Sequence, residues 1–308
     1  MHLLSLLSLA LWLSSVYSAP TLLGLIGPFS TQATTPESAS ALDALTPLAN
    51  FAEQAYCSID QVTSRSCGAP CDATPGVTVL ASGGDGDETP QWYVAHDATS
   101  QSIIVAHQGT HPTNLLSVLN DLEVLPSPLN HTLFPQTSIA VLVHTGFQLA
   151  FERSIDAIDH AVISALQQYS LSSVQVTGHS LGAALGVLNG VHLAQVLPPS
   201  ISVRTTVFGL PRMGNPAWAT MVDATLSGPN PPLIHMSNKL DLFPNIPPQL
   251  LGWQHPQGEV YIEPESGDVV ACAGEENINC ASGNLLPLVI ADHAGPYAGV
   301  LLGGHGCT

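Results

Sequence analysis

The sequence predicts an α/β protein with a mostly parallel central sheet and helices on both faces. Short apolar runs that read as buried strands alternate along the chain with longer segments of helical periodicity. Strands separated by helices favour parallel pairing, because each connection must cross one face of the sheet. With 45% hydrophobic residues, the 308-residue chain can also bury a sizeable core.

The individual elements follow from these patterns. Strands are expected at Trp92–Ala95, Ile103–Ala106, Val141–Val143, Ser173–Thr177, Val203–Phe208 and Leu233–Met236. Helices are expected at Ala41–Tyr56, Phe147–Tyr169 and Leu181–Leu197, the last of them stopped by two prolines.

The N-terminal residues resemble a targeting segment. An apolar run over Leu3–Leu13 is followed by small residues, which predicts a signal peptide over 1–18. The run is shorter than the roughly 20 residues that a transmembrane anchor needs, so we expect a secreted protein without an anchor. Residues 19–40 read as a flexible lead-in or propeptide, and residues 41–308 as one domain.

The charge balance limits the possible partners. The chain has 23 acidic against 5 basic residues and a net charge of −18. Such a surface argues against binding nucleic acid or anionic membranes. It suits a soluble protein that acts on neutral molecules, although a simple gain in solubility would explain the charge equally well.

Six cysteines fit an oxidising compartment. Their spacing suggests two local bonds, Cys67–Cys71 and Cys272–Cys280, which leaves Cys57 to pair with Cys307. Other pairings are possible in principle. Metal ligation is disfavoured because no CxxC pair or His/Cys cluster is present, and we expect no metal or cofactor. Asn130 begins the chain's one glycosylation sequon.

Gly178-His179-Ser180-Leu181-Gly182 matches the G-x-S-x-G nucleophile elbow of α/β-hydrolases. Such an elbow places a serine on a sharp turn between a strand and a helix. The flanking sequence fits, since an alternating strand precedes it and a helix follows. Ser180 would then lie at the positive end of that helix, where developing negative charge is stabilised. We therefore predict that Ser180 is a nucleophile.

The elbow and the segment after it resemble the fungal class 3 lipases, a family of secreted α/β-hydrolases that includes triacylglycerol lipases and feruloyl esterases. Residues 208–215 are similar to the family's G-x-P-R-x-G-N segment. The resemblance runs from about Ala41 to the C-terminus. It implies an α/β-hydrolase fold, and Cys57–Cys307 is similar to the family's tie between the first helix and the C-terminus.

A serine hydroxyl needs a histidine to take its proton. The α/β-hydrolase order of serine, acid and histidine excludes every histidine before Ser180. His293 stands out because residues 292–297 are similar to the family's D-H-x-x-Y motif, with one extra residue before the tyrosine. His255 is the main rival. His235 and His305 are expected to be structural or solvated, as is His179.

The acid that orients this histidine is expected to be Asp241, at the end of a predicted strand. Residues 241–248 resemble the family's D-x-[VF]-P-x-[LI]-P-P stretch, which carries the triad aspartate. The alternative is a surface aspartate that caps a turn. Asp292 is a weaker alternative, because the neighbour of His293 would have to fold back onto it.

Two donors are expected to stabilise the oxyanion that forms when Ser180 attacks. One is the backbone N–H of Leu181, directly after the nucleophile. The other is Thr110, because residues 107–110 resemble the family's R-G-[ST] turn. Gln108 stands where the family has arginine, which leaves the support of this turn open.

A lid is expected after this turn, where the family carries one. Leu115, Leu116, Val118, Leu119 and Leu122 give the segment an apolar helical face. Closed, the helix would cover the site; open, it would face a lipid surface. An ordinary helix packed on the core would have the same pattern.

Together these features predict a secreted serine ester hydrolase that works through an acyl-enzyme. By resemblance, the first choice of function is a triacylglycerol lipase, and the second is an esterase for soluble or plant-derived esters such as feruloyl esters. A catalytically silent secreted binding protein is the alternative from another class. We expect a monomer that acts on a neutral ester or lipid, at a lipid–water interface if the lid exists.

Overall fold

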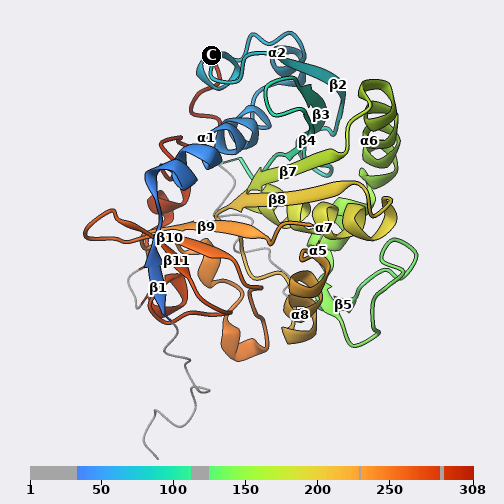
Figure 1. Ribbon diagram of the computed structural model, residues 1–308. Helices are drawn as coiled ribbons and strands as arrows, with labels where there is room; N and C mark the ends of the chain where they lie inside the picture. Colours follow the sequence, from blue (N-terminus) through green and yellow to red (C-terminus); the bar gives the residue numbers. More distant parts are fainter. Residues whose placement is uncertain (1–32, 112–124, 229, 285–287) are drawn as a thin grey trace, which may run out of the picture.

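A mixed nine-stranded sheet forms the centre of the fold in the computed structural model, which describes residues 33–111, 125–228, 230–284 and 288–308. The strand order is β1-β11-β10-β9-β8-β7-β4-β3-β2 (Figure 1). The central strands run parallel; they are β4 (Ser102–His107), β7 (Ser173–His179), β8 (Ser202–Phe208), β9 (Ile234–Asn238) and β10 (Glu259–Ile262). The predicted parallel core is therefore present.

Antiparallel strands extend both edges of this core. One edge carries β3 (Trp92–Asp97) and β2 (Val77–Gly83), and the other carries β11 (Val269–Cys272) and β1 (Thr34–Pro36). A separate two-stranded sheet pairs β5 (Pro126–Pro128) with β6 (Leu142–His144). The predicted strand near Val141 thus exists but lies outside the main sheet.

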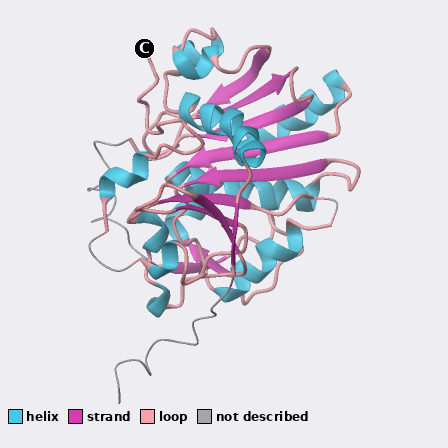
Figure 2. Cartoon of the chain, turned by 60° about the vertical axis from the view of Figure 1, so that its left-hand side comes forward, coloured by secondary structure: helices cyan, strands magenta, loops and turns pink. Residues whose placement is uncertain are grey.

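Helices cover both faces of the sheet (Figures 1 and 2). One face carries α1 (Ala39–Gln54), with α2 (Ile59–Thr63) and α3 (Ala69–Asp72) beside it. The other carries α5 (Thr145–Glu152), α6 (Ile155–Tyr169), α7 (Leu181–Val196) and α8 (Pro216–Thr225). Helix α7 is buried along most of its length, which explains why its sequence is apolar all round.

Four short 3-10 helices of the described chain lie in its C-terminal part, between residues 243 and 294. They are η3 (Phe243–Asn245), η4 (Gln249–Leu251), η5 (Ala281–Gly283) and η6 (Ile290–Ala294). Two of these elements adjoin predicted site residues, because η3 follows Asp241 and η6 contains His293.

Two expectations about helix boundaries need correction. The single helix expected over Phe147–Tyr169 is two helices, because the chain turns at Arg153 and Ser154. There the Ser154 hydroxyl and amide both bond to the Phe151 carbonyl, at 3.3 and 3.1 Å. A serine that bonds to the backbone in this way competes with a continuous helix.

The lead-in expected over 19–40 also ends earlier than predicted. Residues Thr34–Pro36 pair with β11 as an edge strand, and α1 begins at Ala39 rather than Ala41. Ser38 caps the helix by accepting the Ala41 amide at 3.1 Å. The predicted signal peptide and residues 19–32 lie outside the described residues.

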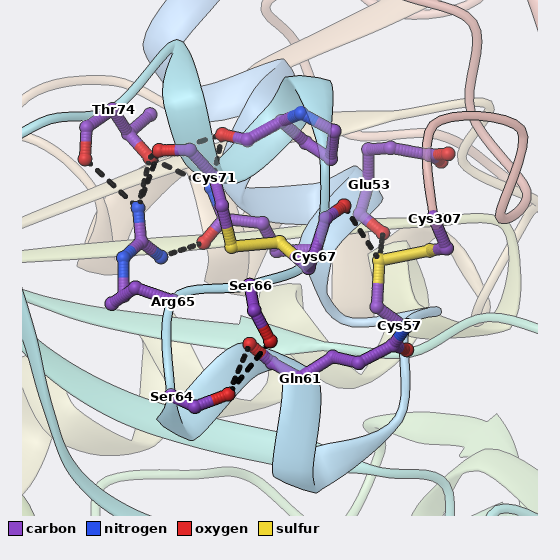
Figure 3. Close-up of a disulfide and its surroundings, with 12 residues drawn as sticks. Glu53, Cys57, Gln61, Ser64, Arg65, Ser66, Cys67, Cys71, Thr74 and Cys307 are labelled. Carbon is purple, nitrogen blue, oxygen red and sulfur yellow. Dashed lines mark hydrogen bonds between the residues drawn. A yellow bond between two sulfur atoms is a disulfide. The ribbon is translucent and has the colours of Figure 1, made fainter.

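Three disulfides join Cys57 to Cys307, Cys67 to Cys71 and Cys272 to Cys280, the same pairs as those proposed from the spacing. The first closes a loop of 250 residues, worth about 5 kcal/mol in the chain-entropy account. Figure 3 shows it beside Glu53, whose carboxylate accepts the amides of Gly303, Gly304 and Gly306 at 2.6–3.0 Å. The C-terminal loop is therefore fixed to α1 by a covalent bond and by a buried carboxylate.

In the part of the chain that the structure describes, no helix has both the length and the apolar character needed to cross a membrane.

Candidate active site

Ser180 lies at the junction of β7 and α7 with φ 61° and ψ −127°, a conformation that costs a non-glycine residue energy. The flanking glycines make the turn possible. A Cβ at Gly178 would lie 2.1 Å from the Gly182 carbonyl oxygen, and one at Gly182 would lie 2.3 Å from the His107 carbonyl oxygen. Strand, turn and helix thus approach more closely than side chains would allow, as the elbow motif requires.

His293 and Asp241 meet although 52 residues separate them in the sequence. The imidazole Nδ1–H donates to Asp241 Oδ2 at 2.8 Å, and both side chains are 1% exposed. Asp241 Oδ1 accepts the Phe243 amide at 2.9 Å, and Oδ2 also accepts the Tyr297 hydroxyl at 3.1 Å. These bonds fix the carboxylate so that it can hold the imidazole in one tautomer.

The His293 ring lies close to the serine turn. Gly209 packs against it, because a Cβ there would be 2.8 Å from the ring carbon Cε1. The residue before Gly209, Phe208, accepts the Ser180 amide at 3.0 Å. His293 Nε2 is buried and has no hydrogen-bond partner among the described residues. The nitrogen that a general base needs is therefore uncommitted.

The rival histidines have other partners. His255 Nε2 bonds to the Pro244 carbonyl at 2.8 Å, and burial lowers the pKa of His255 to about 4. His235 Nε2 bonds to the Pro256 carbonyl at 3.2 Å, and its ring stacks on His255. His305 is exposed in the C-terminal loop. Among the described residues, neither the His255 ring nor the His235 ring bonds to a carboxylate.

Asp292 faces away from the neighbouring imidazole. Its Oδ2 accepts the Leu240 amide at 3.1 Å, and its carbonyl accepts Asn238 Nδ2 at 2.7 Å. Asn238 also donates to the Gly295 carbonyl at 3.1 Å. Asp292 and Asn238 therefore hold the chain segment that carries His293 against the end of β9.

The predicted oxyanion donors lie together. Thr110, Ser180 and Leu181 all line one small apolar pocket of about 30 Å³. Leu181 is the first residue of α7, where amides have no carbonyl partner within the helix. Size does not identify this pocket, since a groove of about 470 Å³ lies elsewhere, between α1 and the β10–β11 hairpin.

Gln108 supports the Thr110 turn in place of the family's arginine. Its side-chain oxygen accepts the backbone amide of Gln91 at 2.8 Å, and its backbone amide donates to the Gln91 carbonyl at 2.8 Å. The side chain is 4% exposed. The substitution thus keeps the turn attached to the chain segment that leads into β3.

A buried ion pair that the sequence reasoning missed supports the pocket wall. Arg212 donates to both carboxylate oxygens of Glu276, at 2.8 and 2.7 Å. It also donates to the carbonyls of Ile246, through its amide, and Pro247, through its guanidinium. Both of these residues line the pocket beside Ser180. Arg212 lies in residues 208–215, the segment that resembles the family, but no sequence signal marks Glu276 as its partner.

Two further predictions have different outcomes. The lid candidates Leu115, Leu116, Val118, Leu119 and Leu122 lie outside the described residues. Asn130 is half-buried, and its side-chain amide donates to Glu152 at 2.8 Å; whether it carries a glycan stays a prediction.

Comparison with known proteins agrees with this geometry. Residues 104–251 match the lipase (class 3) family. A secreted mono- and diacylglycerol lipase of Malassezia restricta is 31% identical over 71% of this chain and 69% of its own length, and one of Malassezia globosa is 31% identical over 85% and 83%. A Yarrowia lipolytica lipase superposes with a TM-score of 0.76 at 26% identity, covering 89% of this chain and 98% of its own. A triacylglycerol lipase whose catalytic centre is a serine protease triad gives 0.76 at 25% identity, over 88% and 99%.

Proposed function

The chain belongs to the class 3 lipase family and is a secreted carboxylic ester hydrolase, and we propose that it cleaves acylglycerols through an acyl-enzyme on Ser180. In this proposal His293 is the general base, Asp241 orients it, and Leu181 and Thr110 stabilise the oxyanion. The observation that carries the proposal is the His293–Asp241 bond of 2.8 Å beside the strained serine turn, with Nε2 left uncommitted.

The reaction follows from this arrangement. As Ser180 Oγ attacks the ester carbonyl, its proton passes to His293 Nε2, and Asp241 stabilises the imidazolium that results. The negative charge that builds up on the former carbonyl oxygen is stabilised at the N-terminus of α7. His293 then protonates the leaving alcohol, and a water molecule releases the acid by the same steps.

The proposed substrates are acylglycerols rather than soluble esters. Both groups of relatives support a lipid substrate, although their names differ between mono- and diacylglycerols and triacylglycerols. The pocket walls beside Ser180 are apolar and include Phe147, Phe243 and Ile246. Such a wall suits an acyl chain.

The surface next to this pocket supports contact with a lipid interface. Leu250 and Leu251 of η4 are 83% and 66% exposed and follow the wall residues by a few positions. Exposed leucines side by side at the edge of a site offer apolar area to a lipid surface.

Hydrolysis of p-nitrophenyl esters from acetate to palmitate, and of emulsified mono-, di- and trioleoylglycerol, tests the proposal. We expect activity on the emulsions and its loss, by about a million-fold, in Ser180→Ala. Activity limited to short or aromatic esters would favour the soluble-ester alternative. Full activity in Ser180→Ala would contradict the nucleophile, and inactivity on every ester would favour a silent binding protein.

The double variant Leu250→Ser/Leu251→Ser tests the interface. We expect activity on emulsions to fall about tenfold while activity on dissolved p-nitrophenyl butyrate stays unchanged, because only the first needs adsorption. Ile163→Ser is the matched control, since Ile163 is 43% exposed on α6. If activity fell equally in both assays, or fell as much in the control variant, Leu250 and Leu251 would have no specific role in binding the interface. The proposal also expects a monomer, which sedimentation can measure.

A further inference from the structure

A hydrogen-bonded chain of buried side chains runs behind the proposed nucleophile. The Tyr56 hydroxyl and His179 Nδ1 are 2.7 Å apart, and His179 Nε2 lies 2.8 Å from the His293 carbonyl oxygen. Tyr56 lies two residues after the end of α1, His179 directly precedes Ser180, and His293 lies in η6. Three segments that are far apart in sequence are thus joined by two bonds.

The direction of these bonds follows from chemistry. A carbonyl oxygen only accepts, so His179 Nε2 must carry a proton and donate to His293. Burial lowers the pKa of His179 well below its usual value, which keeps the ring neutral. In a neutral ring Nδ1 is then an acceptor, so the Tyr56 hydroxyl must donate to it. Neither bond can reverse while the ring stays neutral.

The same hydroxyl contacts the turn that carries Thr110. Gly109 packs so closely that a Cβ there would lie 2.1 Å from Tyr56 Oη, 2.3 Å from the His179 carbonyl oxygen and 3.0 Å from Ser180 Cβ. The Tyr56 hydroxyl and the Gly109 backbone are therefore in direct contact. The chain therefore continues to the residue before the proposed oxyanion donor.

His179 also packs against the ring of the proposed base. The centroids of the His179 and His293 rings are 4.4 Å apart, and Phe243 stacks on His293 at 3.8 Å. The imidazole of His293 therefore contacts His179 as well as Phe243, while its backbone is held by His179 Nε2. Loss of the hydrogen bonds between Tyr56, His179 and His293 would therefore free both the Thr110 turn and the His293 segment.

We propose that Tyr56 and His179 are positioning residues: their hydrogen-bonded chain holds the Thr110 turn and His293 in register on either side of Ser180. This inference rests on the proposed roles of Ser180, His293 and Thr110. The Cys57–Cys307 disulfide follows Tyr56 directly and links this end of α1 to the C-terminal loop (Figure 3). Errors of about 1 Å in such positions can cost roughly 100-fold in rate.

Tyr56→Phe removes one oxygen and interrupts the chain. We expect kcat on p-nitrophenyl butyrate to fall about 10- to 100-fold while KM changes less than about twofold. Affinity for a boronic acid that forms a tetrahedral adduct should fall by the same factor as kcat/KM, because only the transition state needs the alignment.

Tyr93→Phe is the matched control. Tyr93 is a buried tyrosine whose hydroxyl donates to the Phe51 carbonyl at 2.9 Å, outside this chain. It should lower the melting temperature about as much as Tyr56→Phe and leave kcat unchanged. Unchanged kcat and boronate affinity in Tyr56→Phe, or an equal loss of kcat in Tyr93→Phe, would overturn the proposal.

Two measurements keep the outcomes distinct. In the wild type, ¹⁵N NMR should show His179 neutral and protonated at Nε2 from pH 5 to 8; the opposite tautomer would overturn the chain even if Tyr56→Phe does not fold. Ser180→Ala is measured in parallel. Activity retained in Ser180→Ala would contradict the proposed function, whereas its loss together with a fully active Tyr56→Phe would contradict only this inference.

Discussion

Two histidines of this chain, His293 and His255, are buried near carboxylates, but their surroundings differ. At His293 the ring itself donates to Asp241. At His255 the backbone amide donates to Glu276 at 2.7 Å, while the ring bonds to a carbonyl. The Glu276 carboxylate is occupied by a bidentate guanidinium. Of the two rings, only that of His293 donates directly to a carboxylate, which can hold it in one tautomer.

The comparison shows that burial and a nearby acid do not make a base. The pKa of Glu276 would be raised by burial, yet Arg212 and its other partners outweigh this and lower it to about 2. That carboxylate stabilises an ion pair in the pocket wall. Among the described residues no guanidinium bonds to Asp241, which instead accepts a tyrosine hydroxyl, a backbone amide and an imidazole. The partner of the acid thus distinguishes the structural cluster at Glu276 from the proposed catalytic cluster at Asp241.

Replacing the two histidines should give the largest contrast. We expect His293→Asn to lower kcat/KM about a million-fold, because the proposed base that takes the Ser180 proton is lost. His255→Asn should keep kcat within about tenfold and lower the melting temperature instead. Steady-state kinetics on p-nitrophenyl butyrate measures both. A similar loss in the two variants would make His255 the base.

Replacing the two acids should sharpen the distinction. Asp241→Asn should lower kcat about ten-thousand-fold with little change in fold, because the imidazole loses the partner that fixes its tautomer. Circular dichroism checks the fold, and kinetics at saturating substrate gives kcat. A loss below about tenfold would favour Asp292 as the orienting acid.

Glu276→Gln should act on stability more than on rate. It leaves the Arg212 guanidinium buried with one charge uncompensated, which costs about 4 kcal/mol of unfolding free energy. Urea denaturation of the variant and the wild type measures this difference. If kcat fell about ten-thousand-fold while stability was unchanged, Glu276 would belong to the catalytic cluster.

Glu259 is a third buried acid, and among the described residues no guanidinium bonds to it. Burial raises its pKa to about 7, above the 4.5 of the unfolded chain. The folded state therefore binds a proton more tightly, and the stability this gives is full below about pH 4.5 and lost as the pH rises through 7.

Between these limits we expect the unfolding free energy to fall by about 3 kcal/mol. Glu259→Gln should flatten this part of the pH profile, as denaturation at several pH values would show. A variant that keeps the wild-type profile would assign the pH dependence to other groups.

The local parts of the site could be predicted because their residues are adjacent in sequence. Ser180 follows a strand of alternating residues and precedes a helix, and its glycines fall where side chains would collide. The strand Ser102–His107 is buried along its whole length, and Ser202–Phe208 is buried from Thr205 onward, because helices cover both faces of the sheet.

An edge strand and a break between two helices were missed for physical reasons. Strand β1 has three residues and no alternation, and it is stabilised only by pairing with β11. The break between α5 and α6 depends on one serine within a continuous apolar pattern. Local propensity carries little information about either.

The sequence by itself determined the α/β fold class, the serine turn and the short disulfide loops, because each depends on neighbouring residues or on a repeating apolar pattern. Sequence motifs indicated His293 and Asp241 but left His255 and Asp292 open, and only the tertiary structure decided between them. It alone also showed that Glu276 accompanies Arg212 and that Tyr56 reaches His179. Those contacts join residues that the chain brings together only when the sheet and its loops have formed. Spacing along the sequence cannot encode them.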